Sequence, residues 1–239
     1  MNYNPIILAL DSDNLENSWR IFNEVKQNIG MLKLGLEFVY NFGFEEVKKF
    51  QSEIDIFLDL KLHDIPNTTK SALKPIAKLN TALTTIHLLG GSEMVKESKK
   101  ILQEHNSKTK LLGVTILTSH KDISEIGINN SITSQVLKLA EMGLKAGVDG
   151  LVCSPHEIEI IRKEFGFAPI LVVPGIRLDN DTINHQLSTI ICNDDQSRIA
   201  TPKEAILSGA NYLVIGRPIT KSHTPKEECM KILKNISST

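Results

Sequence analysis

The chain has 239 residues, of which 41% are hydrophobic and 23% charged, and its formal net charge is −1. These values are typical of a globular protein with a full core and exclude a disordered chain. They provide neither the basic field that attracts long nucleic acids nor a polybasic membrane signal. We therefore expect no nucleic-acid and no membrane partner.

The first apolar run and the cysteines indicate the compartment. Ile6–Leu10 ends at Asp11 and is too short for a signal peptide or a membrane span. Cys153, Cys192 and Cys229 are widely spaced and include no Cys-x-x-Cys pair, which argues against a disulfide framework and a structural zinc site. We expect a cytoplasmic protein whose cysteines are inert.

Short β-branched runs then alternate with longer helical periods along the chain. After the first run, apolar residues spaced by threes and fours from Leu15 to Ile29 predict a helix that closes at Gly30. Ser92–His105 and the stretch from Ile132 to Gly143 predict two more helices. The predicted strands are Ile6–Leu10, Met31–Gly35, Ile54–Leu60, Leu83–His87, Leu111–Ile116, Asp149–Cys153, Ile170–Val173 and Tyr212–Ile215.

Near the end of the chain, the sequence Thr-Pro-Lys-Glu occurs twice, at Thr201–Glu204 and Thr224–Glu227. Each copy is a capping box with proline at the first helical position. These boxes predict helix starts near residues 202 and 225.

Eight strands that alternate with helices over this length favour an α/β fold, a single-domain (β/α)8 TIM barrel that spans residues 1–239. A doubly wound open sheet is the alternative. The stretch Asp179–Asp195 is polar and patternless, so we expect a long loop there, and long loops in compact domains are usually functional or disordered.

The third predicted strand carries charges at its end. Side chains alternate between the faces of a strand, so Phe57, Asp59 and Lys61 share the face that would point into a barrel. Asp59 and Lys61 would then lie at the carboxyl-end mouth, where barrel active sites are found. A structural ion pair is the plain alternative for these two charges.

Polar residues from other strands would converge on the same rim. Asp11 ends the first strand, Lys33 points inward from the second, and Thr118 follows the fifth. The seventh strand runs into Pro174–Arg177. A single salt bridge does not require such convergence, which is typical of an active site.

The eighth strand runs into Gly216 and Arg217, followed by a helix start. An exposed glycine amide, a guanidinium group and a helix start are together typical of a phosphate site. Barrels commonly bind phosphate after strands seven and eight. We therefore expect phosphate binding at this position.

With these residues in place, the sequence resembles the orotidine 5′-phosphate decarboxylases of de novo UMP synthesis over nearly the whole chain. The most specific motif is Asp-x-Lys-x-x-Asp followed by Ile-Pro-Asn-Thr, at Asp59–Thr68. The other matching segments are Leu8–Asp11, Lys33–Gly35, Val114–Ser119, Pro174–Arg177, Asp194–Pro202 and Tyr212–Thr220. The resemblance implies a homodimeric carboxy-lyase that needs no cofactor and converts orotidine 5′-phosphate to UMP.

The resemblance also implies roles for individual residues. Lys61 would protonate C6 of the pyrimidine, and Asp64 and Thr68 would reach the site of the partner subunit. The implied charge network is Lys33, Asp59, Lys61 and Asp64. The other implied substrate contacts are Asp11 and Lys33 at the ribose, Ile65, Thr118 at the pyrimidine, and Arg177, Gln196, Gly216 and Arg217 at the phosphate.

The chain departs from the family pattern between Arg177 and Gln196, where Thr182–Asn193 looks inserted. Gln196 is assigned from the Asp-Asp-Gln that ends the stretch rather than from its distance to Arg177. Gln186 is the alternative phosphate contact.

Two rival functions remain open. Sugar-phosphate decarboxylases of the same superfamily share Asp-x-Lys-x-x-Asp but, as a family, bind magnesium through an acidic residue where Lys33 stands. A lysine there argues against a metal site. A catalytically inactive phosphate-binding barrel would have lost part of the charged set, yet every expected charge is present. His63 and His87 are interpreted as structural.

Overall fold

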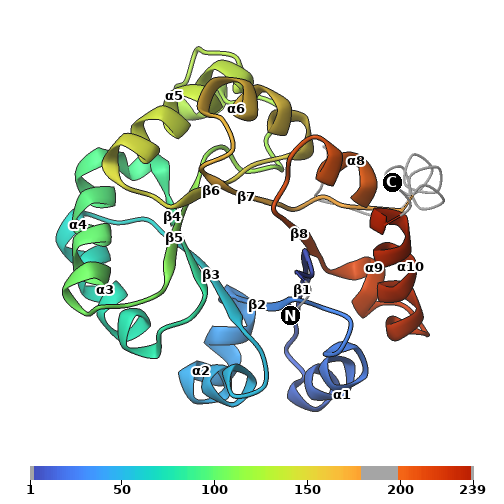
Figure 1. Ribbon diagram of the computed structural model, residues 1–239. Helices are drawn as coiled ribbons and strands as arrows, with labels where there is room; N and C mark the ends of the chain where they lie inside the picture. Colours follow the sequence, from blue (N-terminus) through green and yellow to red (C-terminus); the bar gives the residue numbers. More distant parts are fainter. Residues whose placement is uncertain (1–2, 179–198, 238–239) are drawn as a thin grey trace.

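The computed structural model describes residues 3–178 and 199–237. Eight parallel strands follow one another around a closed barrel, and β8 pairs with β1. Helices surround the strands on the outside (Figure 1). The predicted (β/α)8 barrel is confirmed, and the open sheet is ruled out because the first and last strands pair. The predicted loop at 179–195, which contains Gln186, and the predicted phosphate contact Gln196 both lie outside the described residues.

The elements have the following bounds. The strands are β1 (Ile6–Ala9), β2 (Met31–Gly35), β3 (Ile56–Leu62), β4 (Leu83–His87), β5 (Lys110–Val114), β6 (Gly150–Val152), β7 (Ile170–Val173) and β8 (Tyr212–Ile215). The helices are α1 (Leu15–Val25), α2 (Leu36–Gln51), α3 (Pro66–Leu79), α4 (Gly91–Glu104), α5 (Ile132–Ala146), α6 (Ile158–Phe165), α8 (Pro202–Leu207), α9 (Arg217–Thr220) and α10 (Pro225–Ser237). Short 3-10 helices are η1 (Leu88–Gly90), η2 (Ser124–Ile126) and η3 (Pro155–Glu157).

The predicted bounds of β2, β4, β7 and β8 are confirmed. Strands β1, β5 and β6 differ from their predicted bounds by one or two residues at an end, and the predicted bounds of α1 and β3 are wrong. Helix α1 ends at Val25 rather than at Gly30. The Gly30 N–H already donates to the Ile6 carbonyl at 2.9 Å, so this residue belongs to the approach of β2 to β1. Strand β3 begins and ends two residues later than predicted, which brings Lys61 inside the strand.

Alternation along the strands divides the apolar residues between two cores. The inner core fills the barrel and consists of Ile7, Ala9, Met31, Phe57, Leu83, Leu112, Val172 and Val214. The outer core lies between the strands and the helices and includes Leu8, Leu34, Ile56 and Leu58. Phe57 therefore lies inside the barrel while its neighbours Ile56 and Leu58 lie outside it, as the alternation predicts.

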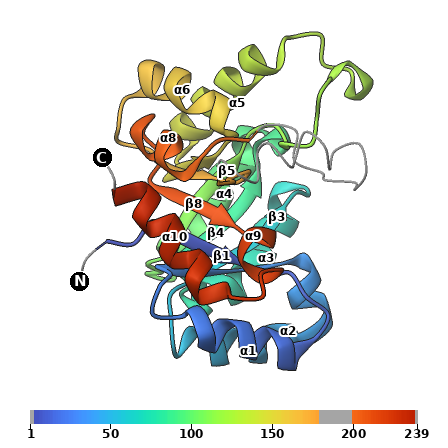
Figure 2. The ribbon, with the colours of Figure 1, turned by 90° about the vertical axis from the view of Figure 1, so that its right-hand side faces the viewer.

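Helix α10 lies between α8 and α1 on the outside of the barrel (Figure 2). Both α8 and α10 begin at the proline that the sequence predicts. In α8 the predicted capping box is present: the Glu204 N–H donates to Thr201 Oγ1 at 3.2 Å, and the Thr201 N–H donates to Glu204 Oε2 at 2.9 Å. These bonds satisfy N–H groups that have no partner within the helix.

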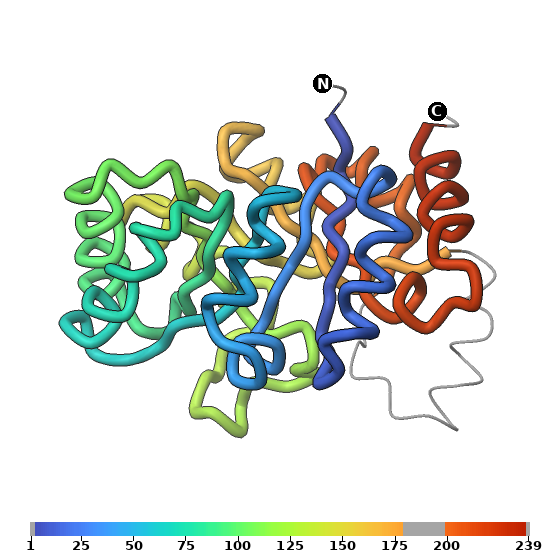
Figure 3. Tube along the Cα trace, turned by 90° about the horizontal axis from the view of Figure 1, so that it is seen from below, coloured from blue at the N-terminus to red at the C-terminus, as the bar shows by residue number. Residues whose placement is uncertain are grey.

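The two ends of the chain point to one side of the barrel, and the yellow-green connection between β5 and α5 projects on the other (Figure 3). The strands enter from the side of the termini, so the connection marks the carboxyl ends of the strands. Within 3–178 and 199–237, no helix is both long and apolar enough to cross a membrane.

Candidate active site

A pocket of about 640 Å³ opens at the carboxyl ends of the strands. Residues from β1, β2, β3, β5, β6, β7 and β8, or from the segments that follow them, line it. Among them are eight residues predicted from the sequence: Asp11, Lys33, Asp59, Lys61, Thr118, Arg177, Gly216 and Arg217. The structure thus brings together residues that lie up to about 200 positions apart, as a barrel mouth allows.

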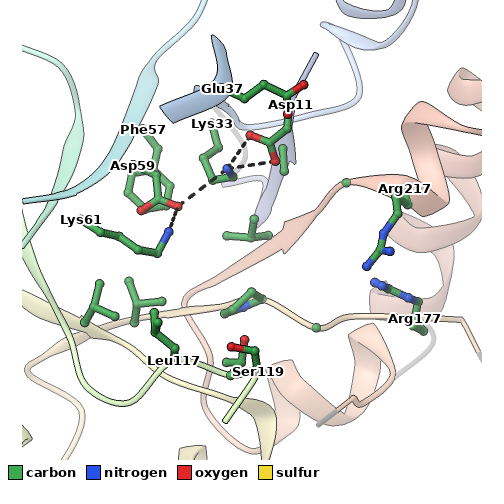
Figure 4. Close-up of a pocket in the computed structure, with 18 of the residues that line it drawn as sticks. Asp11, Lys33, Glu37, Phe57, Asp59, Lys61, Leu117, Ser119, Arg177 and Arg217 are labelled. Carbon is green, nitrogen blue, oxygen red and sulfur yellow. Dashed lines mark hydrogen bonds and ion pairs between the residues drawn. The ribbon is translucent and has the colours of Figure 1, made fainter. Parts of the chain in front are cut away.

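Acidic and basic side chains alternate along one wall of the pocket (Figure 4). Lys33 Nζ lies 3.1 Å from Asp11 Oδ1 and 3.7 Å from Asp59 Oδ2. Lys61 Nζ lies 2.7 Å from the same Asp59 oxygen. The order Asp11, Lys33, Asp59, Lys61 follows β1, β2 and β3 around the barrel, so each lysine lies against at least one carboxylate.

The pKa values of the two innermost groups show that both remain charged. Burial raises the pKa of Asp59, but Lys33 and Lys61 outweigh it and hold that pKa below its ordinary value. Burial lowers the pKa of Lys33, but Asp59 and Asp11 outweigh it and hold that pKa above its ordinary value. The charged state of each group therefore depends on its neighbours.

The backbone of β3 is irregular where these side chains emerge. Lys61 has a φ of 46°, in the left-handed region that a residue with a Cβ rarely adopts. In the pairing with β4, Leu58 lies opposite Thr84 and Leu62 opposite Ile86, so β3 holds two more residues than its partner here. Such strain costs about 1–3 kcal/mol and persists only where the surroundings enforce it.

Two arginines lie on the other side of the pocket. In Figure 4 the side chains of Arg177, after β7, and Arg217, after β8, point toward one another. Gly216 precedes Arg217 and lines the same region, as does Lys221 at the end of α9. Two converging guanidinium groups suit a phosphate, because each can donate two parallel hydrogen bonds to its oxygens.

Three predicted residues do not line the pocket of their own chain. Asp64, Ile65 and Thr68 are exposed at the start of α3, and Ile65 is 67% exposed. The Asp64 carboxylate accepts a hydrogen bond from the Ile65 N–H at 2.7 Å. In a single chain, the charge network therefore comprises Lys33, Asp59 and Lys61 without Asp64.

The two histidines of this region stack on one another, with ring centroids 5.2 Å apart and an angle of 19° between the planes. His87 is buried, and burial together with His63 and Lys61 lowers its pKa to about 4. It is therefore neutral at pH 7, in keeping with the structural interpretation.

Some residues at the site were not predicted. Glu37 and Lys221 line the pocket from the first turn of α2 and the end of α9, and Ser119 lies beside Thr118. Glu37 and Lys221 were hard to predict from the sequence, because charged residues at helix ends are common on any protein surface. Among the described residues, no group of three His, Cys, Asp or Glu side chains could hold a metal ion.

The fold and the site define a (β/α)8-barrel enzyme with a charged pocket, one side of which carries two arginines. The chain matches the model of the orotidine 5′-phosphate decarboxylase / HUMPS family over residues 4–232. It belongs to that family.

Individual relatives agree with this placement. A protein of Wolbachia sp. subsp. Brugia malayi (strain TRS) is 43% identical over 237 residues, which cover 98% of this chain and 100% of the relative. A protein of Gluconobacter oxydans (strain 621H) is 41% identical over 239 residues, 98% and 97% of the two chains. Both are named orotidine 5′-phosphate decarboxylase. The crystal structure of orotidine 5′-phosphate decarboxylase from Lactobacillus acidophilus matches with a TM-score of 0.82 at 37% identity, and the match covers 98% of this chain and 100% of that one.

Proposed function

We propose that this protein is a carboxy-lyase that converts orotidine 5′-phosphate to UMP in pyrimidine biosynthesis. The observation that carries the proposal is the arrangement of charge in one pocket. On one side of the pocket, Lys61 Nζ lies 2.7 Å from Asp59 Oδ2. On the other side lie Arg177 and Arg217. A nucleoside monophosphate has its base and its phosphate at opposite ends and fits this arrangement.

The substrate lies with its phosphate at Arg177, Arg217 and Gly216 and its pyrimidine near Thr118, with Gln196 as a further phosphate contact. Asp11 and Lys33 hold the ribose hydroxyls between these ends. Binding energy from the phosphate, remote from the reacting bond, holds the base in position for reaction.

At the base, the bond between C6 and the carboxylate breaks, CO2 leaves, and the electron pair stays on C6. Lys61 places an ammonium group where this negative charge develops and then gives its proton to C6. Asp59 lies beside the substrate carboxylate and disfavours the ground state by like-charge proximity. No single ion pair supplies the roughly 8–23 kcal/mol that enzymes provide, so the wall of charges and the phosphate act together.

The active form is a homodimer in which Asp64, Ile65 and Thr68 of each chain complete the site of the other. Their exposure outside their own pocket supports this arrangement. A large apolar side chain such as Ile65, 67% exposed beside a charged motif, is typical of an interface. An Asp64 carboxylate from the partner would extend the alternation of charge beyond Lys61.

The protein functions as one domain in the cytoplasm. Cys153 and Cys229 are both buried and unpaired by disulfide, as in proteins of a reducing compartment.

A direct assay tests the function. Purified protein is mixed with orotidine 5′-phosphate, and the loss of substrate absorbance is followed with and without EDTA. We expect turnover to UMP in both samples, because Lys33 stands where the sugar-phosphate decarboxylases have a magnesium ligand. Loss of activity in EDTA that magnesium restores would favour those enzymes, and no turnover at all would favour an inactive barrel.

A further inference from the structure

Thr85 on β4 lies directly behind the charged wall of the pocket. It is fully buried and does not line the pocket, so a bound substrate would not reach it. Strand alternation places it, like Leu83, on the inner face of the barrel. From there its hydroxyl contacts both Asp59 and Lys61.

One hydroxyl group makes both contacts. The Thr85 O–H donates to Asp59 Oδ1 at 2.9 Å, and the Lys61 backbone N–H donates to Thr85 Oγ1 at 2.8 Å. A hydroxyl has one proton to donate and two lone pairs to accept, so a single threonine serves both roles. Valine has the same shape but neither capacity.

The bond to Asp59 holds the orientation of the carboxylate. Both lysines contact the other oxygen, Oδ2, with Lys61 at 2.7 Å and Lys33 at 3.7 Å. With Oδ1 held by Thr85 and Oδ2 turned toward the lysines, the carboxylate cannot rotate without losing one set of contacts. Its position relative to the ammonium group of Lys61 is thereby defined.

The bond to Lys61 stabilises the irregular backbone of β3. The two extra residues of β3 lie opposite Thr85, between the pairs Leu58–Thr84 and Leu62–Ile86. In this stretch the Lys61 N–H donates to a side chain, and the residue adopts a φ of 46°. The Thr85 hydroxyl thus takes the place of a strand partner where the regular pairing is interrupted.

We propose that Thr85 is a positioning residue for the decarboxylation, in which one hydroxyl sets both the Asp59 carboxylate and the backbone from which Lys61 reaches the substrate. This inference rests on the proposed function. It assigns Thr85 an effect on the chemical step and not on substrate binding.

The neighbouring Thr84 provides a matched control. It is equally buried on the adjacent position of β4, and its hydroxyl donates to the Leu58 carbonyl at 3.0 Å. Thr84→Val therefore removes one buried hydroxyl and one bond to β3 without touching Asp59 or Lys61, whereas Thr85→Val removes one buried hydroxyl and two bonds to β3. A purely structural role for Thr85 predicts that both substitutions lower stability and that neither lowers kcat more than the other.

The experiment compares Thr85→Val, Thr85→Ser and Thr84→Val with the wild type. We expect Thr85→Val to lower kcat roughly ten- to hundredfold, the usual effect of losing a hydrogen bond to a charged group, with KM and the Kd of UMP changed by less than about threefold. Thr85→Ser, which keeps the hydroxyl, should restore kcat to within about threefold of wild type, and Thr84→Val should leave it within about twofold.

The pH profile adds a second readout. Asp59 faces Lys33 from β2, Lys61 from β3 and Thr85 from β4, and Lys33 also contacts Asp11. Removal of the Thr85 hydroxyl takes away one bond to the ionised carboxylate, so the acidic limb of kcat/KM should move to higher pH. The limb should not move in Thr84→Val.

Equal kcat values for Thr85→Val and Thr84→Val, or a loss confined to KM, would overturn the inference while leaving the proposed function intact. No turnover by the wild type would overturn the proposed function instead. In that case a crystal structure of Thr85→Val still tests the geometry, since an unchanged Asp59 carboxylate and Lys61 φ would refute the positioning role. If Thr85→Val does not fold, Thr85→Ala serves in its place.

Discussion

Asp59 lies at the centre of the charged side chains of the pocket, and its carboxylate compensates the charges of two lysines. It lies against Lys33 and Lys61, and its side chain is only 9% exposed. A buried charge is costly unless its neighbours compensate it, and here each charge compensates another. Changes to single members of this set should therefore affect stability and activity in separable ways.

Lys61→Ala should abolish UMP formation while the protein stays folded. The substitution removes the proposed proton donor, and Asp59 keeps its contact with Lys33. We expect activity to fall at least about thousandfold in the absorbance assay, with the circular dichroism spectrum unchanged. Lys70→Ala is the control, because Lys70 pairs with Glu97 at 2.6 Å outside the pocket. A folded and active Lys61→Ala would contradict the role of Lys61.

Asp59→Asn should destabilise the protein by about 3 kcal/mol at pH 7, because it leaves two lysines without their shared carboxylate. The folded-state pKa of Asp59 lies below its ordinary value of 3.8. Its contribution is therefore complete above pH 3.8 and is lost as the pH falls through the folded-state pKa. Urea unfolding of the wild type and of Asp59→Asn gives the difference in their free energies of unfolding, which should be smaller at pH 3 than at pH 7. An equal difference at the two pH values would contradict the link between the pKa of Asp59 and stability.

At the scale of elements, an aromatic cluster joins α1 to α2. The Trp19 and Phe50 rings stack with centroids 3.8 Å apart and 12° between planes, and Phe22 and Phe38 pack edge-on against Phe50. Phe50 is fully buried at the C-terminal end of α2. The cluster anchors the helices that follow β1 and β2. Lys33 lies on β2, and Asp11 lies between β1 and α1.

Phe50→Ala should lower the free energy of unfolding by about 3–5 kcal/mol, the usual cost of deleting a buried phenylalanine. Trp19 is the only tryptophan, so its fluorescence in urea reports the loss directly. Phe167→Ala is the control: this ring is 76% exposed and lies 5.0 Å from the Arg162 guanidinium, so we expect a change of about 1 kcal/mol or less. Similar urea midpoints for Phe50→Ala and Phe167→Ala would contradict a stabilising role of the aromatic cluster.

At the scale of the whole molecule, the proposed homodimer places residues of two chains in each site. If Lys61 of one chain acts with Asp64 of the other, a mixed dimer of Lys61→Ala and Asp64→Asn contains one intact site. Each variant alone should be inactive. A refolded equal mixture should regain about a quarter of wild-type activity, since half the dimers are mixed and each has one good site.

The matched control is a mixture of Lys61→Ala with Lys33→Ala. Both lysines lie in the same chain's pocket, so every site in that mixed dimer lacks one of them and no activity should return. Recovery in the control, or none in the first mixture, would contradict the sharing of Asp64 across the interface.

Much of this molecule could be predicted from the sequence because its signals are local. Alternation along a strand shows which residues share a face, so the position of Phe57, Asp59 and Lys61 inside the barrel follows from their spacing. Proline and capping residues mark the starts of helices, which located α8 and α10. The eight strands, and the position of Gly216 and Arg217 at the end of the eighth, follow from the same patterns.

Other features depended on which strands meet and in what register, and only the tertiary structure decided them. The two extra residues of β3, the left-handed Lys61 and the Thr85 hydroxyl between Asp59 and Lys61 arise from contacts between β3 and β4. The exclusion of Asp64 from its own pocket depends likewise on where α3 begins. A sequence pattern shows the face that a side chain takes, but the partner opposite it is set by packing between distant segments.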